Sequence, residues 1–474
     1  MANLQQVSCK AFPGLAAAAL AMCACALTQA ARAPMDPGVR GGAAEAGGPL
    51  KGLTADETAF FQDGLARFAQ IESVTGGQNS GLGPRFNSHS CLSCHSHPNV
   101  GGSSPATNPL VAIATLQGAK NAVPWFITQK GPIREARFKR NPDGTNDGGV
   151  HDLFVVTGRS DAAGCNIAQP NFLPAGDPVS GQRGNPNIVF RIPTPMFGAG
   201  LIESIPDSSI IANMEADAKF KKPMGISGHP NAHLSGNANR SANDGTITRF
   251  GWKAQNKSLL LFAGEAYNVE MGVTNQLFPQ ERDETPGCLF NPTPEDTLNF
   301  TTNPSATANP NTAVVSDIEA FADFTRMLAP PTPAPDTPST IKGRAAFASV
   351  GCAYCHTPSF TTGKAIASGS AKNPSAALSN QPVYLYSDLL VHHMGVDLAD
   401  GITQGSAGPD EFRTAPLWGV GQRIFFLHDG RTADLIKAIE AHSSRGSEAN
   451  QVIEHFNRLS NEQRQDIINF LRAL

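Results

Sequence analysis

A five-residue motif, Cys-x-x-Cys-His, occurs at residues 91–95 and again at 352–356, and it limits the folds that are open to this chain. Two thiols at this spacing can add to the two vinyl groups of a haem, and the following histidine then lies under the iron as its proximal ligand. A redox dithiol needs no such histidine, and a zinc site needs further cysteine or histidine ligands nearby. The motifs therefore predict two covalently bound haem c groups. The predicted attachment and proximal-ligand residues are Cys91, Cys94, His95, Cys352, Cys355 and His356.

The N-terminal segment resembles a secretory signal. It contains an Ala/Leu-rich run, Leu15–Leu27, and no acidic residue precedes Asp36. We interpret residues 1–33 as a signal peptide and expect a periplasmic protein, which agrees with haem attachment outside the cytoplasm. The sequence before Cys23 faintly resembles a lipoprotein processing box, but Met22 is larger than the residue expected there, so a lipid anchor is the weaker alternative. Beyond this segment, no apolar run reaches the length of about 18 residues that would predict a membrane span.

The remaining cysteines form a pair. The chain has nine cysteines, of which three lie in the predicted signal peptide and four belong to the two motifs. Cys165 and Cys288 are left, and both lie in loops that contain Gly or Pro. Disulfides persist in exported proteins. We therefore predict a Cys165–Cys288 disulfide, with two buried free thiols as the alternative.

Charge and composition narrow the class of protein further. The 474 residues include 36 Lys+Arg and 40 Asp+Glu, a formal net charge of −4. This balance argues against a nucleic-acid partner, which would favour a basic face. The 46 glycines and 36 prolines predict a chain rich in loops with short regular elements.

The sequence around each haem motif repeats. A Gly-x-x-x-Phe string on a helical pattern precedes each motif, at 64–68 and 343–347. An apolar-x-Phe-x-Arg-x-Leu string follows each motif, at 322–328 and 468–474, and its apolar residues share one helix face. One helix before the motif and an amphipathic helix at the end is how a cytochrome c domain encloses its haem. We therefore predict a mainly α fold with two cytochrome c-type haem domains.

The repeats also suggest where the domains begin and end. Thr54 and Ser339 are the expected N-caps of the helices that precede the motifs. About 220 residues separate the first motif from its closing helix, so the first domain should carry a long loop-rich insertion. A stiff segment with five prolines separates the two domains. The predicted organisation is a signal peptide at 1–33, an N-terminal domain at 34–328 with an insertion at about 105–310, a Pro-rich linker at 329–338 and a C-terminal domain at 339–474.

Further strings carry a resemblance to a known family. They lie at 83–87 (GPRFN), 249–254 (RFGWKA), 270–274 (EMGVT), 427–431 (LHDGR) and 441–442 (AH). With the two motifs, they make the chain similar, from about residue 54 to 474, to the bacterial di-haem cytochrome c peroxidase superfamily. More narrowly, the chain resembles the di-haem oxidoreductase branch, also called thiol oxidoreductase-like. The resemblance implies an enzyme in which two c-type haems cooperate.

The resemblance also implies roles for single residues. The glutamate of the Glu-Met-Gly string is the acid/base beside the peroxide-binding haem in the peroxidases, and here it is Glu270. A tryptophan about 20 residues earlier lies between their haems, and here it is Trp252. Their second haem is ligated by a methionine 14 residues after the histidine of the His-Asp-Gly string. His442 occupies that position here, which implies that His356 and His442 are the two axial ligands of the second haem.

Alternatives remain for each of these roles. Glu203, in a Gly-rich apolar string, is the rival acid/base, because such surroundings raise the pKa of a carboxyl group. Met394 is the rival ligand for the second haem, and His229 or His233 could close the distal side of the first. Each candidate also has a structural reading, as a surface carboxylate, a core tryptophan or a helix-end histidine. The candidate partners for the haem propionates, which could equally be surface residues, are Arg85, Arg413 and Arg431.

The chain departs from the peroxidases at two places. They have a glutamine near the catalytic glutamate, but residues 260–263 read Leu-Leu-Phe-Ala. Their inter-haem calcium pattern is absent from residues 423–427, just before His428. The sequence therefore does not support a calcium ion as a third cofactor.

Together these features predict an exported di-haem c-type cytochrome oxidoreductase. We expect it to reduce hydrogen peroxide at the N-terminal haem, with electrons delivered through the C-terminal haem from a small redox protein or cytochrome. One alternative is a di-haem electron-transfer protein without catalysis of its own. Another is an oxidase of sulfur compounds or of protein side chains.

Overall fold

The structure is a computed structural model that describes residues 33–474 apart from 77–78, 173–186, 233–245, 299–314 and 366–373. All but the last residue of the predicted signal peptide lies outside the described residues, as does His233. In the described ranges the regular structure is mostly helical, as expected, and the strands form only small antiparallel sheets. No helix in these ranges is long and apolar enough to cross a membrane.

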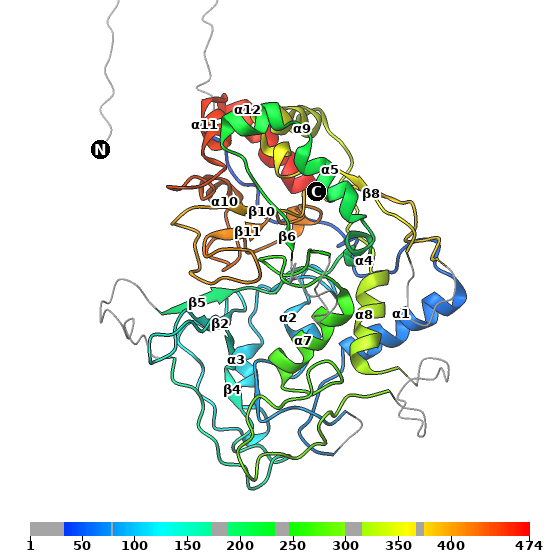
Figure 1. Ribbon diagram of the computed structural model, residues 1–474, viewed down its shortest axis with the longest axis vertical. Coiled ribbons are helices and arrows are strands. Elements are labelled where there is room, and N and C mark those ends of the chain that lie inside the picture. Colours follow the sequence, from blue (N-terminus) through cyan, green and yellow to red (C-terminus); the bar gives the residue numbers. More distant parts are fainter. Residues whose placement is uncertain (1–32, 77–78, 173–186, 233–245, 299–314, 366–373) are drawn as a thin grey trace, which may run out of the picture. The chain divides into compact units, whose positions relative to one another are not determined.

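Twelve α-helices occur in the described residues (Figure 1). The helices are α1 (Ala55–Phe68), α2 (Cys91–Cys94), α3 (Leu110–Ile113), α4 (Ala199–Glu203), α5 (Asp207–Glu215), α6 (Ala218–Lys221), α7 (Leu259–Met271), α8 (Asp317–Met327), α9 (Pro338–Val350), α10 (Leu435–Glu440), α11 (Asn450–Arg458) and α12 (Asn461–Ala473). Two of the short 3₁₀ helices, η3 (Cys352–Tyr354) and η4 (Val420–Gln422), belong to the C-terminal half.

The strands are two to four residues long. The sheet β3-β2-β5 has three strands, and the two-stranded sheets are β1–β4, β6–β7, β8–β9 and β10–β11. The strands are β1 (Arg85–Phe86), β2 (Glu135–Phe138), β3 (Val150–His151), β4 (Phe154–Val155), β5 (Ile188–Arg191), β6 (Asn231–Ala232), β7 (Ile247–Thr248), β8 (Phe360–Thr361), β9 (Pro382–Val383), β10 (Val391–His393) and β11 (Glu411–Arg413). The three-stranded sheet and helices α3 to α7 lie within the segment expected to be a loop-rich insertion.

The helices on either side of each motif pack in pairs, α1 with α8 and α9 with α12 (Figure 1). The glycine of each Gly-x-x-x-Phe string lies against the closing helix. A methyl group on Gly64 would lie 2.7 Å from Cβ of Phe324, and one on Gly343 would lie 2.9 Å from Cβ of Phe470. Only glycine allows so close an approach, so the repeated glycine has the same packing reason in both halves.

The N-caps of these helices follow the expectation in one half only. Thr54 caps α1, where its side chain accepts the backbone N–H of Glu57. In the second half the cap is Thr337, not Ser339 as expected. The physical reason is Pro338, which occupies the first helical position, where proline needs no hydrogen-bond partner for its nitrogen. Ser339 lies inside the helix instead and its hydroxyl bonds to Asp466 of α12.

A second repeat escaped the sequence analysis. Residues 195–200 (PMFGAG) precede and enter α4, and residues 416–421 (PLWGVG) precede and enter η4. The first glycine of each string has a positive φ, +66° at Gly198 and +72° at Gly419. The N–H of each donates at 3.0 Å to the backbone oxygen of the leucine that ends the closing string, Leu328 for Gly198 and Leu474 for Gly419. The second glycine of each lies against the carbonyl oxygen of the arginine in the closing helix. The duplication therefore extends beyond the helix pairs.

The hydrophobic core has two main parts. The larger surrounds α1, α7 and α8 and includes Phe61, Phe68 and Phe324. The other surrounds α9, α11 and α12 and includes Phe347 and Phe470. Residues 34–474 nevertheless form one compact unit by their contacts.

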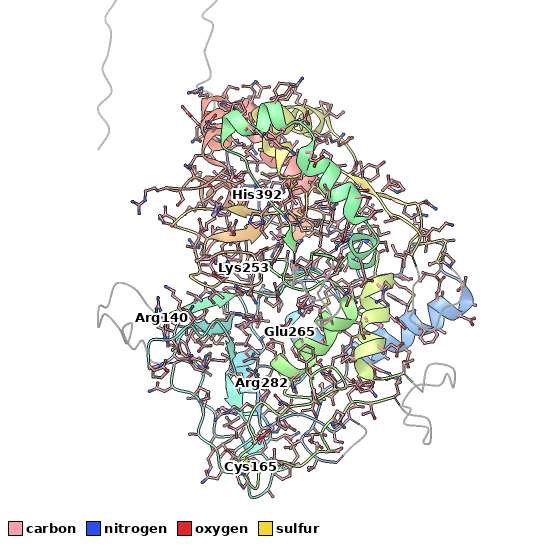
Figure 2. All side chains as sticks on the ribbon, in the orientation of Figure 1. Arg140, Cys165, Lys253, Glu265, Arg282 and His392 are labelled. Carbon is pink, nitrogen blue, oxygen red and sulfur yellow. A yellow bond between two sulfur atoms is a disulfide. The ribbon has the colours of Figure 1, made fainter. Side chains whose placement is uncertain are left out.

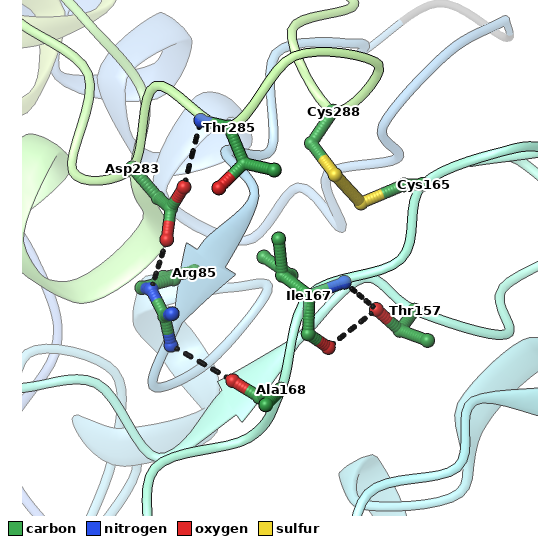
Figure 3. Close-up of a disulfide and its surroundings, with 8 residues drawn as sticks. All are labelled: Arg85, Thr157, Cys165, Ile167, Ala168, Asp283, Thr285 and Cys288. Carbon is green, nitrogen blue, oxygen red and sulfur yellow. Dashed lines mark hydrogen bonds and ion pairs between the residues drawn. A yellow bond between two sulfur atoms is a disulfide. The ribbon is translucent and has the colours of Figure 1, made fainter.

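The predicted disulfide is confirmed (Figure 3). Cys165 and Cys288 are bonded, and their positions differ by 123 in the sequence. Arg85 lies in the same region, where its guanidinium donates to Asp283 at 2.6 Å and to the carbonyl oxygen of Ala168 at 3.2 Å. These partners favour a structural role for Arg85 over a bond to a haem propionate.

Candidate functional site

The C-terminal motif opens onto a cavity of about 210 Å³. Cys352 and Cys355, at η3, and the adjacent His356 line one side of it. His442, just after α10, and Met394, just after β10, line the same cavity. Its walls are mostly apolar and come from α9, α10, α11 and α12. Residues far apart in the sequence thus meet around one space that is many times larger than a water molecule needs.

Three histidines are held in the same way. The Nδ1–H of His95 donates to the carbonyl oxygen of Gly102 at 3.0 Å. His356 donates to Tyr386 at 2.9 Å, and His442 donates to Ala438 at 2.8 Å. Such a bond through Nδ1 fixes the ring, which is the usual arrangement of a histidine that binds a metal through Nε2.

Burial keeps these histidines neutral. Loss of solvent lowers the pKa of His95 and of His356 to about 4. It also lowers the pKa of His442. At neutral pH all three rings are therefore uncharged, which is the form that binds a metal.

The thiols and aromatic neighbours of the two motifs also match. None of the four motif cysteines is paired in a disulfide. The ring of Phe68 lies 6.3 Å from that of His95, and the ring of Phe347 lies 6.2 Å from that of His356. The free thiols, the oriented neutral histidines and the apolar cavity fit a covalently attached haem with an axial histidine ligand.

Glu270 lies near the end of α7, next to the N-terminal motif. Its Oε2 accepts a hydrogen bond from Nδ2 of Asn87 at 2.8 Å, and its backbone oxygen accepts the N–H groups of Asn87 and Ser88 at 2.7 and 3.1 Å. These bonds connect α7 to the segment that leads into Cys91. Loss of solvent and the neighbouring carboxylate of Glu135 raise the pKa of Glu270 to about 8, so this group can exchange a proton near neutral pH.

Glu135, on β2, was not found by the sequence analysis. Its carboxyl group is hydrogen-bonded to that of Glu270 and also forms an ion pair with Arg137. No motif marks Glu135, and 135 positions separate it from Glu270. Only the folded chain brings the two carboxyl groups together. The same region of α7 also carries Glu265, labelled in Figure 2.

Glu203, the rival acid, has both carboxylate oxygens engaged. Oε2 accepts from Nε of Arg326 at 2.7 Å, and Oε1 accepts from the N–H of Leu259 at 2.8 Å. Glu203 therefore connects the end of α4 to α8 and to the start of α7. This arrangement favours a structural role.

A smaller cavity, of about 70 Å³, lies between the repeated strings at 195–200 and 416–421. Pro195 and Phe197 of the first string and Pro416 and Trp418 of the second line it. Trp252 belongs to the walls of both cavities. Trp252 therefore lies in a wall that the two cavities share.

Two arginines share that wall with Trp252. Arg413 and Arg423 line both cavities. Arg431 is absent from both linings and pairs with Asp429 at 2.8 Å. Arg413, a candidate propionate partner, thus lines the cavity of the C-terminal motif. Arg423 lines it as well and was missed because no motif contains it.

His229, the described candidate for the distal side of the first haem, lies beside β10 and β11. The half-exposed His229 bonds to Glu411 at 2.7 Å. The buried His392, labelled in Figure 2, lies between two carboxylates. Its ring nitrogens are 2.9 Å from Asp388 and 2.7 Å from Glu448, and its Nδ1 is 3.8 Å from Sγ of Cys355. The strong hydrogen bonds of His392 hold it as a support beside the C-terminal motif.

Comparison with known proteins identifies relatives of this arrangement. Residues 183–474 match the sequence profile of a family described as "Di-haem oxidoreductase, putative peroxidase". No protein in the curated set matches the chain. The matching range contains the C-terminal motif and the Glu-Met-Gly string, whereas the N-terminal motif precedes it.

Several solved structures are also similar. The diheme peroxidase BthA from Burkholderia thailandensis shares 15% identity, with 60% of this chain and 86% of that chain covered and a TM-score of 0.27. Hydrazine synthase from Kuenenia stuttgartiensis shares 21% identity over 35% of this chain and 56% of that chain, with a TM-score of 0.22. A MauG-like protein associated with microbial copper homeostasis shares 16% identity over 36% of this chain and 54% of that chain, with a TM-score of 0.22. The chain thus spans just over half the length of the latter two structures.

Proposed function

This chain belongs to the di-haem oxidoreductase family, and from that premise we propose that it is an exported c-type cytochrome that reduces hydrogen peroxide. In this proposal peroxide is reduced at the N-terminal haem. Electrons arrive through the C-terminal haem from a small redox protein or cytochrome. The signal peptide, the domain boundaries at 34–328 and 339–474, and the periplasmic location are parts of the same proposal.

The observation that carries the proposal is that the two Cys-x-x-Cys-His motifs have the same structural surroundings. Each motif has two thiols that are free of disulfides and a neutral histidine whose Nδ1–H is held by a backbone carbonyl. Each is enclosed by a helix pair with the same glycine contact. Two equivalent haem-binding units in one chain suit the reduction of peroxide, because splitting the O–O bond needs two electrons.

The proposal assigns each haem to its own set of residues. Cys91 and Cys94 would form thioether bonds to the first haem, and Cys352 and Cys355 to the second. His95 and His356 would be the proximal ligands. His442 is the better candidate for the far side of the second haem, because its Nε2 is free and its ring is fixed, and Met394 is the alternative in the same cavity. When bound, the haem groups supply iron that takes up peroxide and exchanges electrons.

Glu270 would move the proton in this reaction. With a pKa of about 8, its carboxyl group can take a proton from the near oxygen of peroxide and return it to the departing oxygen. Asn87 orients the carboxyl group by its hydrogen bond at 2.8 Å. Glu135, hydrogen-bonded to Glu270, would share that proton and keep the pair from carrying two negative charges.

Trp252 would lie on the path between the haems. Its indole N–H donates to the carbonyl oxygen of Ile192 at 2.8 Å, which fixes the ring in the wall that the two cavities share. A fixed aromatic ring between two redox groups can shorten the distance that each electron must cross. Arg413, in the same wall, would bind a haem propionate.

The spin state of the N-terminal haem distinguishes an enzyme from an electron carrier. We expect a high-spin signal in the oxidised or the half-reduced protein by electron paramagnetic resonance, because peroxide needs an exchangeable iron site. Two low-spin haems at every redox level, with no peroxide turnover, would instead identify a pure electron-transfer protein. Turnover of a sulfur compound without peroxide would favour the oxidase alternative.

A further inference from the structure

The two arginines in the shared wall have unusual surroundings. Arg413 ends β11, and Arg423 follows η4. Other well-buried arginines of this chain have a carboxylate partner, as Arg191 has in Asp400 at 2.6 Å and Arg472 has in Asp36 at 2.7 Å. Arg413 and Arg423 belong to none of the ion pairs found among the described residues. Two cations thus lie in one wall without a protein counter-ion.

Arg423 is the more extreme of the two. Its Nε and Nη2 are buried, and neither atom has a hydrogen-bond partner in the part of the chain that the structure describes. The guanidinium lies 5.6 Å from the centre of the Trp252 ring. Such a cation–π contact stabilises a guanidinium by less than it costs to bury a charge without a counter-ion. The ring alone therefore does not offset the burial of Arg423.

Arg413 adds a second positive charge to this wall, also without a carboxylate partner. Its Nε donates to the carbonyl oxygen of Gly251 at 3.0 Å. Burial and the charge of Arg423 lower the pKa of Arg413 to about 10, against the opposing effect of Asp388. Asp388 is itself engaged, because its oxygens accept from His392 at 2.9 Å and from the N–H of Leu390 at 3.1 Å. Both arginines stay charged at neutral pH and repel each other, so the site is suited to an anion.

We propose that Arg413 and Arg423 form a carboxylate-binding site that takes the propionates of the haem bound in the larger cavity. This inference rests on the proposed function, since a haem must be attached at Cys352 and Cys355. Haem propionates are carboxylates, and a guanidinium binds a carboxylate through paired N–H donors. The smaller cavity, at about 70 Å³, is too confined to supply the ligand, which therefore comes from the larger one.

The reduction potential of the C-terminal haem tests this site. We expect R423Q to retain both haems by intact mass and to show a lower potential in an optical redox titration, because a lost positive charge disfavours the reduced iron. R423K, which keeps the charge, should retain most of the wild-type potential. R445Q is the matched control, because it removes a charge at an exposed position of the same half. Excess acetate should not change the wild-type potential, since the propionates already occupy the site.

The possible results distinguish a failure of the proposed function from a failure of the carboxylate site. Wild-type protein without haem mass on the C-terminal motif would contradict the proposed function itself. Haem present, with the same potential in R423Q as in R445Q, would overturn the carboxylate site. An acetate-dependent potential would mean that a free carboxylate, and not a propionate, binds there. If R423Q does not retain haem, R413Q is compared with R445Q by the same criterion.

Discussion

At the scale of single residues, what this chain can bind depends on how its histidines are held. His95, His356 and His442 each give Nδ1–H to a backbone carbonyl and stay neutral through burial. A sequence motif identifies the first two, because the histidine is adjacent to the cysteines. His442 lies outside both motifs and is marked only by the family resemblance. Its ring is fixed by Ala438 and lines the same cavity as the C-terminal motif, which adds support for a ligand role.

The first prediction concerns the acid/base residue. Glu270→Gln removes the carboxylate and should lower peroxide turnover by about 100-fold or more, while both haems stay attached by intact mass. Glu203→Gln, at the rival carboxylate, should retain turnover per folded molecule. Wild-type turnover in E270Q combined with a loss in E203Q would transfer the role to Glu203.

The second prediction concerns the pH dependence set by Glu135. Glu270 must be ionised to take a proton, and its pKa of about 8 means that wild-type turnover rises as the pH rises towards 8. Glu135→Gln removes a neighbouring negative charge and lowers the pKa of Glu270. The rising limb of the pH–rate profile should therefore move to lower pH, whereas Glu135→Asp should move it little. An unchanged midpoint in E135Q would show that the two carboxyl groups do not interact.

At the scale of elements, the structure is built on a helix pair used twice. The repeated glycine, phenylalanine and closing helix were predicted from the sequence, because a close helix contact requires glycine at a fixed distance from the phenylalanine. The second repeat, at 195–200 and 416–421, was missed because its residues are short turns with no helical pattern. In each copy a glycine with positive φ donates its N–H to the backbone oxygen of the leucine that ends the closing string.

The third prediction tests this helix contact. In Gly343→Ala, the new methyl group would lie 1.9 Å from the carbonyl oxygen of Asp466, and the backbone of α12 would have to move. The free energy of unfolding should fall by about 1–3 kcal/mol, measured by denaturant titration. Gly48→Ala is the control, because nothing lies within 4 Å of its added methyl group. Equal stability of the two variants would contradict the packing role of Gly343.

At the scale of the whole molecule, local features were easier to predict from the sequence than long-range contacts. The two motifs, the helix pairs and the Cys165–Cys288 disulfide are local or countable features, and the structure retains them. Glu135 and Arg423 were not predictable, because their significance lies in long-range contacts or in the lack of a protein partner. The N-cap at Thr337 could have been predicted from the sequence, because proline favours the first helical position and Pro338 follows Thr337.

The fourth prediction concerns the disulfide. Cys165→Ser with Cys288→Ser opens a loop of 123 residues, and the free energy of unfolding should fall by about 2–5 kcal/mol. Peroxide turnover at low temperature should change little, because the bond lies outside the candidate site. Thermal unfolding of the wild type with and without reductant gives an independent check. A variant as stable as the oxidised wild type would contradict a stabilising role for this bond.

Oxidation of a small cytochrome by peroxide decides whether this chain reduces peroxide with two covalently bound haems. Purified protein that carries two haem additions by intact mass is mixed with a reduced small cytochrome, and oxidation of that cytochrome is followed on addition of hydrogen peroxide. The account predicts oxidation that depends on both peroxide and the protein and that is largely lost in E270Q. No peroxide-dependent oxidation by the fully loaded protein, with any of several small cytochromes as donor, would contradict it.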